Sequence, residues 1–333
     1  MSSHRFLTGI TPSGTPHLGN YVGAIRPSVL ASQRADVDSF YFLADYHALI
    51  KSDDPARIQR STLEIAASWL AAGLEPQRVT FYRQSDIPEI AELTWLLTCV
   101  TSKGLLNRAH AYKAAVDQNA AAQQEPDHEV NAGLFMYPVL MAADILAYQS
   151  NTVPVGQDQK QHVEVTRDIA MKFNNQFGPV FTIPEPSIRE TVAVVPGIDG
   201  RKMSKSYDNH IELFGAEKAT RARIMRIVTD STPMESPKDP DKCNVYALYR
   251  LIASPEEANA MAQHYRAGGY GYGQAKKALA DAVVEYFKEF RTRREELRKD
   301  LGSVEEILRK GAEVARHEAR KTLDKARKAV GIA

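Results

Sequence analysis

The residues best suited to chemistry lie in a short stretch with the sequence GITPSGTPHLGN, residues 9–20. It follows an apolar run, residues 6–10, that is typical of a strand, and it precedes residues 21–25, which can begin a helix. We expect Thr15 to cap this helix and Pro16 to be its first residue. Free backbone N–H groups and the positive end of the helix dipole would then face the loop, which suits it to hold phosphate.

Individual residues of this loop add to its capacity for binding. Gly9, Gly14 and Gly19 lack a Cβ atom, so a phosphate or a flat ring can approach the backbone closely. His17 and Asn20 stand one helical turn apart and offer two side-chain hydrogen-bond donors on one face. An ordinary connecting loop is the alternative, because glycine, proline, serine and threonine are all common in turns. This stretch alone does not decide between the two interpretations.

A second stretch favours the chemical interpretation. Residues 200–206 read GRKMSKS, in which Lys202 and Lys205 flank small residues, and the polar pair Asp208-Asn209 follows. We interpret this segment as a mobile loop whose two ammonium groups can close over an anion.

Together the two stretches resemble the signatures of the class I aminoacyl-tRNA synthetases. HLGN at residues 17–20 is similar to the first signature, usually written HIGH, and KMSKS at residues 202–206 matches the second letter for letter. Asn20 departs from the class, which has a second histidine there; an amide still donates a hydrogen bond but carries no charge. A closer resemblance, over nearly the whole chain, is to the bacterial tryptophanyl-tRNA synthetase family, on PSG (12–14), LGNY (18–21), YPVLMAADIL (137–146) and VPVGQDQKQH (153–162).

This resemblance implies that ATP activates L-tryptophan to tryptophanyl-adenylate, releasing pyrophosphate, and that tryptophan then passes to the 3′-terminal ribose of tRNA(Trp). Negative charge gathers on phosphate oxygens in the transition state, so positioned cations and donors supply the catalysis. We predict that Lys202 and Lys205 stabilise the leaving pyrophosphate, while His17 and Asn20 hold phosphate oxygens and Gly19 admits the adenosine. No protein nucleophile is needed, because the carboxylate of the substrate attacks.

Further ATP contacts are predicted where GQDQ, residues 156–159, leaves a strand and enters a helix, at the edge of a parallel sheet where ligands bind. There Asp158 can hydrogen-bond ribose hydroxyls, although complementing the helix dipole is an alternative role. We expect Mg²⁺ to accompany the ATP phosphates, and the sequence offers no carboxylate cage for it. The predicted nucleotide-binding residues are Thr11, Ser13, Gly19, Asn20, Gly156, Asp158, Lys202, Met203, Ser204 and Lys205.

Asp144 is the predicted contact for the side chain of the amino acid. It lies within an otherwise apolar helical stretch, residues 137–146, where an unpaired buried carboxylate is costly, so a donor must bind it. With Met141 one turn earlier, it suits an indole ring with a single N–H donor, and the resemblance implies that this aspartate binds the indole nitrogen. An internal salt bridge is the alternative, and a tyrosine hydroxyl can donate to the same carboxylate, so pocket shape must separate the two amino acids.

Other residues are predicted to line the same pocket by the resemblance and by their places near element ends. For His47, a satisfied core histidine is an equally good interpretation. Lys103 and Lys113 receive no role. The added pocket residues are Phe6, His47, Tyr137, Val153, Val155 and Gln159.

The elements that position these residues alternate between strand and helix, which indicates a Rossmann-like α/β fold with a parallel sheet and crossover helices. We assign residues 1–207 to this nucleotide-binding catalytic domain, with a mobile insert at residues 117–132 and the signature loop at 200–206. Strands are expected at residues 6–10, 39–50, 79–83, 152–156 and 180–183. Helices are expected at residues 56–72, 103–116, 137–148 and 157–177. A further helix is expected to begin with a cap at residues 86–89.

Beyond Tyr207 the apolar residues recur at helical spacing, apart from loops at residues 232–242 and 268–273. We expect residues 208–333 to form an all-helical domain that binds the tRNA anticodon, as the resemblance implies, with the last helix free to pack back on the catalytic domain. Residues 276–328 are rich in both basic and acidic side chains. Ion pairs on a solvated surface are the plainer interpretation, and a basic subset facing one way is what RNA phosphates would need.

Composition narrows the choice of partners. The net charge of +1 gives no argument for a nucleic-acid partner from overall charge, so RNA must meet a local basic face, and no DNA partner is expected. Cys99 and Cys243 lie far apart, which argues against a disulfide framework or a metal cluster. No signal segment and no run of about eighteen apolar residues is present, so a cytoplasmic protein without a membrane partner is expected.

Two other functions stay open from the sequence. One is a related class I enzyme that forms an adenylate with another acid, tyrosine first. The other is a non-catalytic RNA-binding relative, against which His17, Lys202 and Lys205 argue, because a pure binding module has no need of two lysines on a mobile loop. A homodimer is implied by the resemblance alone.

Overall fold

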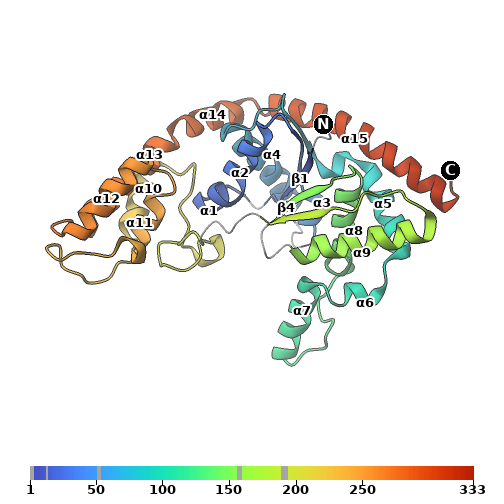
Figure 1. The fold of residues 1–333 in the computed structure, drawn as a ribbon, viewed down its shortest axis with the longest axis horizontal. Coiled ribbons are helices and arrows are strands. Elements are labelled where there is room, and N and C mark those ends of the chain that lie inside the picture. The colour runs from blue at the N-terminus through green and yellow to red at the C-terminus, as the bar shows by residue number, and fades with distance from the viewer. Residues whose placement is uncertain (1–3, 13, 51–53, 156–159, 189–193) are drawn as a thin grey trace.

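The structure, a computed structural model, describes residues 4–12, 14–50, 54–155, 160–188 and 194–333 (Figure 1). Within these residues a five-stranded parallel sheet forms the centre, in the order β3-β2-β1-β4-β5. The order changes direction between β1 and β4, and ligands of such sheets bind outside the carboxyl ends of the strands at this point. The predicted Rossmann-like class is confirmed. The strands are β1 (His4–Ile10), β2 (Val37–Leu43), β3 (Val79–Arg83), β4 (Thr152–Val155) and β5 (Glu185–Ile188).

Helices connect the strands and cover both faces of the sheet. The first long one begins as the sequence predicts, since Asp54 accepts a hydrogen bond from the Arg57 N–H at 3.0 Å and Pro55 is the first helical residue. The connecting helices are α1 (Leu18–Asn20), α2 (Arg26–Ser32), α3 (Asp45–Ala48), α4 (Pro55–Ala71), α5 (Pro88–Val100), α6 (Lys103–Leu106), α7 (His110–Ala121), α8 (Ala132–Leu146) and α9 (Lys160–Phe177), with the short turns η1 (Tyr21–Ile25) and η2 (Gln84–Asp86).

The centre of β2 explains its aromatic sequence. Tyr41 and Leu43 pack into the apolar cluster that α2 and α4 complete, whereas Phe40 and Phe42 pack into the cluster of α5, α8 and α9. Successive side chains of a strand point to opposite faces, so a strand covered on both sides is apolar throughout. The strand ends at Leu43, earlier than the expected residue 50, because α3 begins two residues later.

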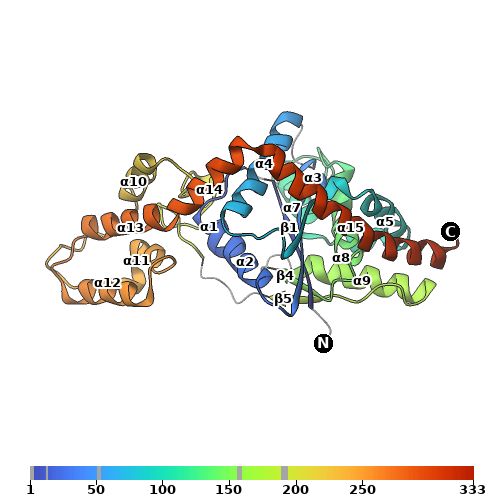
Figure 2. The ribbon, with the colours of Figure 1, turned by 90° about the horizontal axis from the view of Figure 1, so that it is seen from above.

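The second half of the chain is helical, as expected. Figures 1 and 2 show α10 to α13 gathered beside the sheet domain, and α14 and α15 running back across the sheet domain to the C-terminus. These helices are α10 (Glu217–Met225), α11 (Asn244–Tyr249), α12 (Pro255–Ala267), α13 (Tyr272–Tyr286), α14 (Lys288–Lys299) and α15 (Leu301–Val330), with the turns η4 (Lys205–Tyr207) and η5 (Pro240–Lys242).

Helix α15 packs directly on β3, an edge strand of the sheet, and on α5. Gly311 allows the close approach, since a Cβ atom there would lie 1.8 Å from the carbonyl oxygen of Phe81. Charged pairs flank this contact: Arg83 at the end of β3 pairs with Glu305, and the buried Glu89 of α5 binds Arg320 at 2.8 Å. The edge of the sheet is thereby covered by a helix, which protects its unpaired backbone groups.

Besides the early end of β2, four details of the expected elements are wrong. The first helix begins at Leu18 with His17 as its N-cap, not with Thr15 and Pro16, because the backbone on both sides of His17 is paired with a distant segment. The expected helix at residues 103–116 is broken between α6 and α7, where Gln161 accepts from the His110 N–H at 3.0 Å and donates to the Arg108 carbonyl at 3.1 Å.

The other two differences concern the insert and the last strand. Helix α7 continues through residue 121 and α8 already begins at residue 132, so both ends of the expected loop at 117–132 are helical. The expected strand at residues 180–183 is absent from the described chain, and β5 follows at 185–188 instead. The side-chain oxygen of Asn174 accepts from the N–H groups of Val180 and Phe181, and its NH₂ group donates to the Phe181 carbonyl. These backbone groups are therefore not available to pair with a neighbouring strand.

A Gly311→Ala variant tests the packing of α15 on β3. The added methyl group collides with the strand backbone, so we expect the free energy of unfolding to fall by about 1–3 kcal/mol, as in other overpacked contacts. Urea unfolding followed by circular dichroism measures the change. Gly302→Ala, in the first turn of the same helix, is the matched control, because its nearest neighbour there is a side-chain oxygen at 3.4 Å. Equal stability of the two variants would contradict the packing described.

Candidate active site

The structure brings the two signatures together through their backbones. The Leu18 N–H donates to the Ile211 carbonyl at 2.8 Å, and the Leu213 N–H donates to the Pro16 carbonyl at 3.3 Å. Met203, within KMSKS, is buried beside Gly19, where a Cβ atom would lie 3.6 Å from that of Met203. Two motifs almost 200 residues apart in the sequence therefore form one site.

His17 and Asn20 cap each other at the start of α1. The Asn20 N–H donates to Nδ1 of His17 at 3.3 Å, and the His17 N–H donates to Oδ1 of Asn20 at 3.1 Å. Because Nδ1 accepts, the neutral ring carries its proton on Nε2. Burial, with the nearby charges of His210 and Lys205, lowers the pKa of His17 to about 4. The ring is therefore a neutral donor through Nε2 near pH 7.

The two signature lysines differ in position. Lys205 is half-buried, and its ammonium group faces the glycine turn of the first loop: a Cβ atom at Gly14, whose φ is 82°, would lie 3.6 Å from Nζ. Burial lowers the pKa of Lys205, with Glu212 opposing the shift and Arg57 adding to it. Lys202 lies exposed at the surface. One lysine is thus placed against the first loop and the other faces solvent.

Asn209 anchors the signature loop, a role that the sequence analysis missed. Its buried side chain accepts from the Ser204 N–H at 2.7 Å and donates to the Lys202 carbonyl at 3.0 Å and to Asp199 at 2.7 Å. Gly197 makes room for it, because a Cβ atom there would lie 2.3 Å from Cγ of Asn209. The sequence identified Asn209 only as part of the polar pair that follows this loop, and its three partners are visible only in three dimensions.

Asp144 lies on α8 with 2% of its surface exposed, and both of its carboxylate oxygens are bound. Nε2 of His47, on α3, is 2.9 Å from Oδ2, and Nε2 of Gln84 is 2.8 Å from Oδ1 and 2.9 Å from Oδ2. Burial raises the pKa of Asp144, while the bonds from His47 and Gln84 act against this shift. The donor that the sequence required is therefore present. Gln84 was not predicted, although its place directly after a buried strand was a usable signal.

Tyr137 and Met141 lie on the same helix as Asp144, spaced by four and three residues, so the three share one face. The hydroxyl group of Tyr137 is hydrogen-bonded to Nε2 of His162, and its ring lies edge-on to that of His47 with 6.2 Å between centroids. Met141 is partly buried against the apolar cluster of this side of the sheet. Helix α8 thus presents an aromatic ring, a thioether and a carboxylate beside His47.

The remaining predicted residues fall into two groups. Phe6 lies on β1, where its backbone pairs with Thr152 of β4, next to the buried Val153, and Thr11 is exposed directly after β1. The other group cannot be placed: Ser13, Gly156, Asp158 and Gln159 lie outside the described residues, as does the side chain of Val155.

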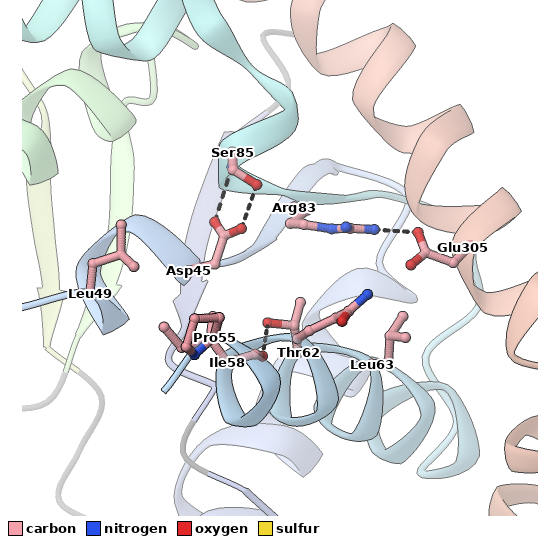
Figure 3. A pocket seen from close by; sticks show the side chains of 10 residues that line it. Asp45, Leu49, Pro55, Ile58, Thr62, Leu63, Arg83, Ser85 and Glu305 are labelled. Carbon is pink, nitrogen blue, oxygen red and sulfur yellow. Dashed lines mark hydrogen bonds and ion pairs between the residues drawn. The ribbon is translucent and has the colours of Figure 1, made fainter. Parts of the chain in front are cut away.

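A cavity of about 260 Å³ lies beside this site, between α3, α4 and α15 (Figure 3). Asp45 forms one wall and accepts from the Ser85 N–H at 3.0 Å and from its hydroxyl group, as Figure 3 shows. Arg83, with Glu305, forms another wall. Its lining includes no residue of the predicted tryptophan or ATP sites. The cavity adjoins the turn that carries Gln84.

Two features of the described residues bear on membrane and metal binding. None of the helices there is both long and apolar enough to cross a bilayer. No group of three or more histidine, cysteine, aspartate or glutamate side chains in those same ranges is arranged to hold a metal ion.

The fold and the paired signatures define a class I aminoacyl-tRNA synthetase. Over residues 2–288 the chain matches the family described as tRNA synthetases class I (W and Y), and it belongs to this family.

Two relatives within the family are named tryptophan–tRNA ligases. The chain is 58% identical to the tryptophan–tRNA ligase of Pseudomonas aeruginosa over 331 residues, 98% of this chain and 74% of the relative. It is 52% identical to the tryptophan–tRNA ligase of Neisseria meningitidis over 333 residues, 100% of this chain and 99% of the relative. The structure superposes on the tryptophanyl-tRNA synthetase of Campylobacter jejuni in complex with ADP and tryptophan with a TM-score of 0.89, at 44% identity, covering 98% of this chain and 99% of that one.

The pKa of His17 predicts a dependence of stability on pH. His17 is held neutral in the folded protein, with a pKa of about 4, whereas the unfolded chain binds a proton near pH 6.5. The stability that this group contributes is present above pH 6.5 and is lost as the pH falls towards 4. In a His17→Asn variant, which retains a capping oxygen but does not titrate, we expect the free energy of unfolding to fall less steeply between pH 7 and pH 5.

Urea unfolding at several pH values measures this slope, and His317→Asn on the exposed face of α15 is the control. We expect a difference in slope of the order of 1 kcal/mol per pH unit between His17→Asn and the unmodified chain, and none for the control. Identical slopes for all three proteins would show that His17 titrates normally.

Proposed function

We propose that this chain is a tryptophan–tRNA ligase. It activates L-tryptophan with ATP, releases pyrophosphate, and transfers tryptophan to the 3′-terminal ribose of tRNA(Trp). The observation that carries the proposal is the single site that joins HLGN to KMSKS in a chain 52% identical, along its full length, to a tryptophan–tRNA ligase. ATP is the nucleotide, in keeping with the ADP bound by the Campylobacter jejuni relative.

In the first step a carboxylate oxygen of tryptophan attacks the α-phosphorus of ATP, and the bond to the pyrophosphate oxygen breaks with its electron pair leaving on pyrophosphate. We assign His17 and Asn20 to the phosphate oxygens, through Nε2–H and the amide NH₂. Lys205, already against the first loop, and Lys202, which approaches as the loop closes, neutralise the charge on the leaving group. Fixed donors and cations of this kind lower the barrier because they need no reorganisation as the charge develops.

Further contacts to ATP are proposed by position in the signatures. Thr11 and Ser13 belong to the first loop, and Gly19 leaves space for the adenosine. Met203 and Ser204 present the backbone of the second loop, while Gly156 and Asp158 are assigned to the ribose. Mg²⁺ is proposed to enter with ATP, held through the phosphate oxygens, since such ions are commonly bound by substrate phosphates rather than by a protein cage.

The tryptophan side chain is assigned to the pocket at Asp144, whose carboxylate accepts the indole N–H. The flat ring is placed against the apolar and aromatic groups around it. A pocket that fits the larger ring, rather than the carboxylate alone, separates tryptophan from tyrosine. The proposed pocket residues are Phe6, His47, Tyr137, Met141, Asp144, Val153, Val155 and Gln159.

In the second step the terminal ribose hydroxyl attacks the carbonyl carbon of the adenylate and AMP leaves. We assign residues 1–207 to this chemistry and residues 208–333 to the tRNA anticodon. Ion pairs engage many basic residues of the last two helices, including Arg298 with Glu64 at 3.1 Å and Arg327 with Glu92 at 2.7 Å.

We also propose a homodimer that works in the cytoplasm. In support, α5 exposes an apolar stripe of Pro88, Ala91, Trp95 and Cys99, in which Trp95 is 67% exposed. A large exposed aromatic side chain within such a stripe is typical of a surface that a protein covers.

Amino-acid-dependent exchange of pyrophosphate into ATP tests the proposal. We expect exchange with tryptophan but not with tyrosine or without an amino acid. Lys202→Ala and Lys205→Ala should each lower kcat by about 10²–10³-fold, the loss typical of one electrostatic contact to a developing charge. Lys218→Ala, on the exposed surface of α10, is the control. Faster exchange with tyrosine would overturn the assignment of Asp144, and no exchange with any amino acid would favour an RNA-binding relative.

A further inference from the structure

Gln84 occupies an unusual position for a polar side chain. It lies in η2, directly after β3, with none of its surface exposed. Its Nε2 group faces Asp144 at 2.8 Å from one oxygen and 2.9 Å from the other. Only the NH₂ end of an amide can face two oxygens of an ionised carboxylate, so the orientation of Gln84 is settled by its partner.

The oxygen atom at the other end of the same amide has no comparable interaction. Oε1 of Gln84 is buried and has no hydrogen-bond partner among the described residues. Leaving a buried acceptor without a donor costs about 1–3 kcal/mol. The chain tolerates this cost at a fully buried position, which indicates that the donor end of Gln84 is what is needed there.

The neighbouring residue ties the same turn to α3. The Ser85 N–H and hydroxyl group both bind Asp45, the first residue of α3 (Figure 3). His47 lies two residues further along this helix. The turn η2 therefore contacts Asp144 directly through Gln84. It also acts on Asp144 indirectly, because Ser85 binds the helix that positions His47. No other described residue side chain is hydrogen-bonded to Asp144.

The two donors to Asp144 are chemically different. Whether Nε2 of His47 donates depends on which ring nitrogen carries the proton, whereas an amide N–H is always a donor. An ionised carboxylate only accepts hydrogen bonds, and an indole ring only donates one. A donor that does not titrate thus keeps the carboxylate in the form that the indole requires.

We propose that Gln84 is a positioning residue for tryptophan: it fixes the plane of the Asp144 carboxylate and keeps it an acceptor for the indole N–H. Gln84 acts through Asp144 and does not itself contact the reacting atoms. This inference rests on the proposed function, because it assigns the partner of Asp144 to the side chain of the substrate.

The pH dependence of tryptophan binding separates this role from a structural one. Other titratable groups face Asp144 from α3, from β3 and from the chain after α8: His47 and Asp45, Tyr82, and Tyr148. They are the same in every variant below, so a change in the pH profile reports the residue at position 84. Removing a donor to a carboxylate raises its pKa, and replacing the donor by a second acid makes the two groups share a proton.

Gln84→Met removes the donor at nearly constant length. In pyrophosphate exchange we expect the KM for tryptophan to rise about 10- to 100-fold at pH 7.5, and to rise further as the pH falls from 8 to 6. The KM for ATP should stay within about twofold. Gln84→Glu should show the opposite trend, since its carboxyl group donates to Asp144 only when protonated, so that the KM for tryptophan falls as the pH falls.

Gln149→Met is the matched control, because Gln149 is also hydrogen-bonded, to Val180 and Thr182, but does not contact Asp144. Thermal unfolding of each variant reports folding, and Gln84→Glu at pH 6 gives the test if Gln84→Met does not fold. Equal increases in the KM values for tryptophan and ATP, or parallel pH profiles for the two Gln84 variants, would overturn the proposal. An unmodified enzyme without tryptophan-dependent exchange would instead overturn the proposed function.

Discussion

The burial of one negative charge organises the carboxyl edge of the sheet. Asp144 lies inside an apolar helix, where an ionised carboxylate without donors would cost several kcal/mol. Its donors come from the chain just after two other strands, His47 after β2 and Gln84 after β3. A parallel sheet is what makes this possible, because all of its strands end at the same edge. The position of α8 against the sheet is therefore linked to the residues that leave β2 and β3.

A second constraint joins the nucleotide site. The backbone around His17 pairs with the backbone around Glu212, so that the start of α1 and the segment after KMSKS hold each other in place. Because of this pairing the backbone is extended at His17, and the helix begins only at Leu18. It also sets the ring of His17 5.9 Å from that of His210, near Lys205, in surroundings that favour its neutral form. The electrostatics of the first signature thus depend on residues that only the fold brings near.

These two constraints explain which features of the fold and the site could be predicted from the sequence and which could not. The strand at residues 79–83, the capped start of α4 and the need for a donor to Asp144 follow from local patterns, namely an apolar run, an Asp-Pro pair and a buried charge. The identity of that donor does not, because Gln84 is 60 residues away in sequence. The start of α1 was misplaced for the same reason. The displaced last strand depended on the side chain of Asn174, which no periodicity reveals.

The long C-terminal helix α15 contacts the residue directly before η2, the turn in which Gln84 binds Asp144. Arg83, the last residue of β3, pairs with Glu305 of α15, and Gln84 follows immediately with its bonds to Asp144. Because Gly311 lets α15 rest against the backbone of β3, the helix contacts the strand itself rather than only its side chains. Helix α14 connects α15 to the rest of the helical half of the chain. This half of the chain therefore contacts the edge of the proposed tryptophan pocket through two consecutive residues, Arg83 and Gln84.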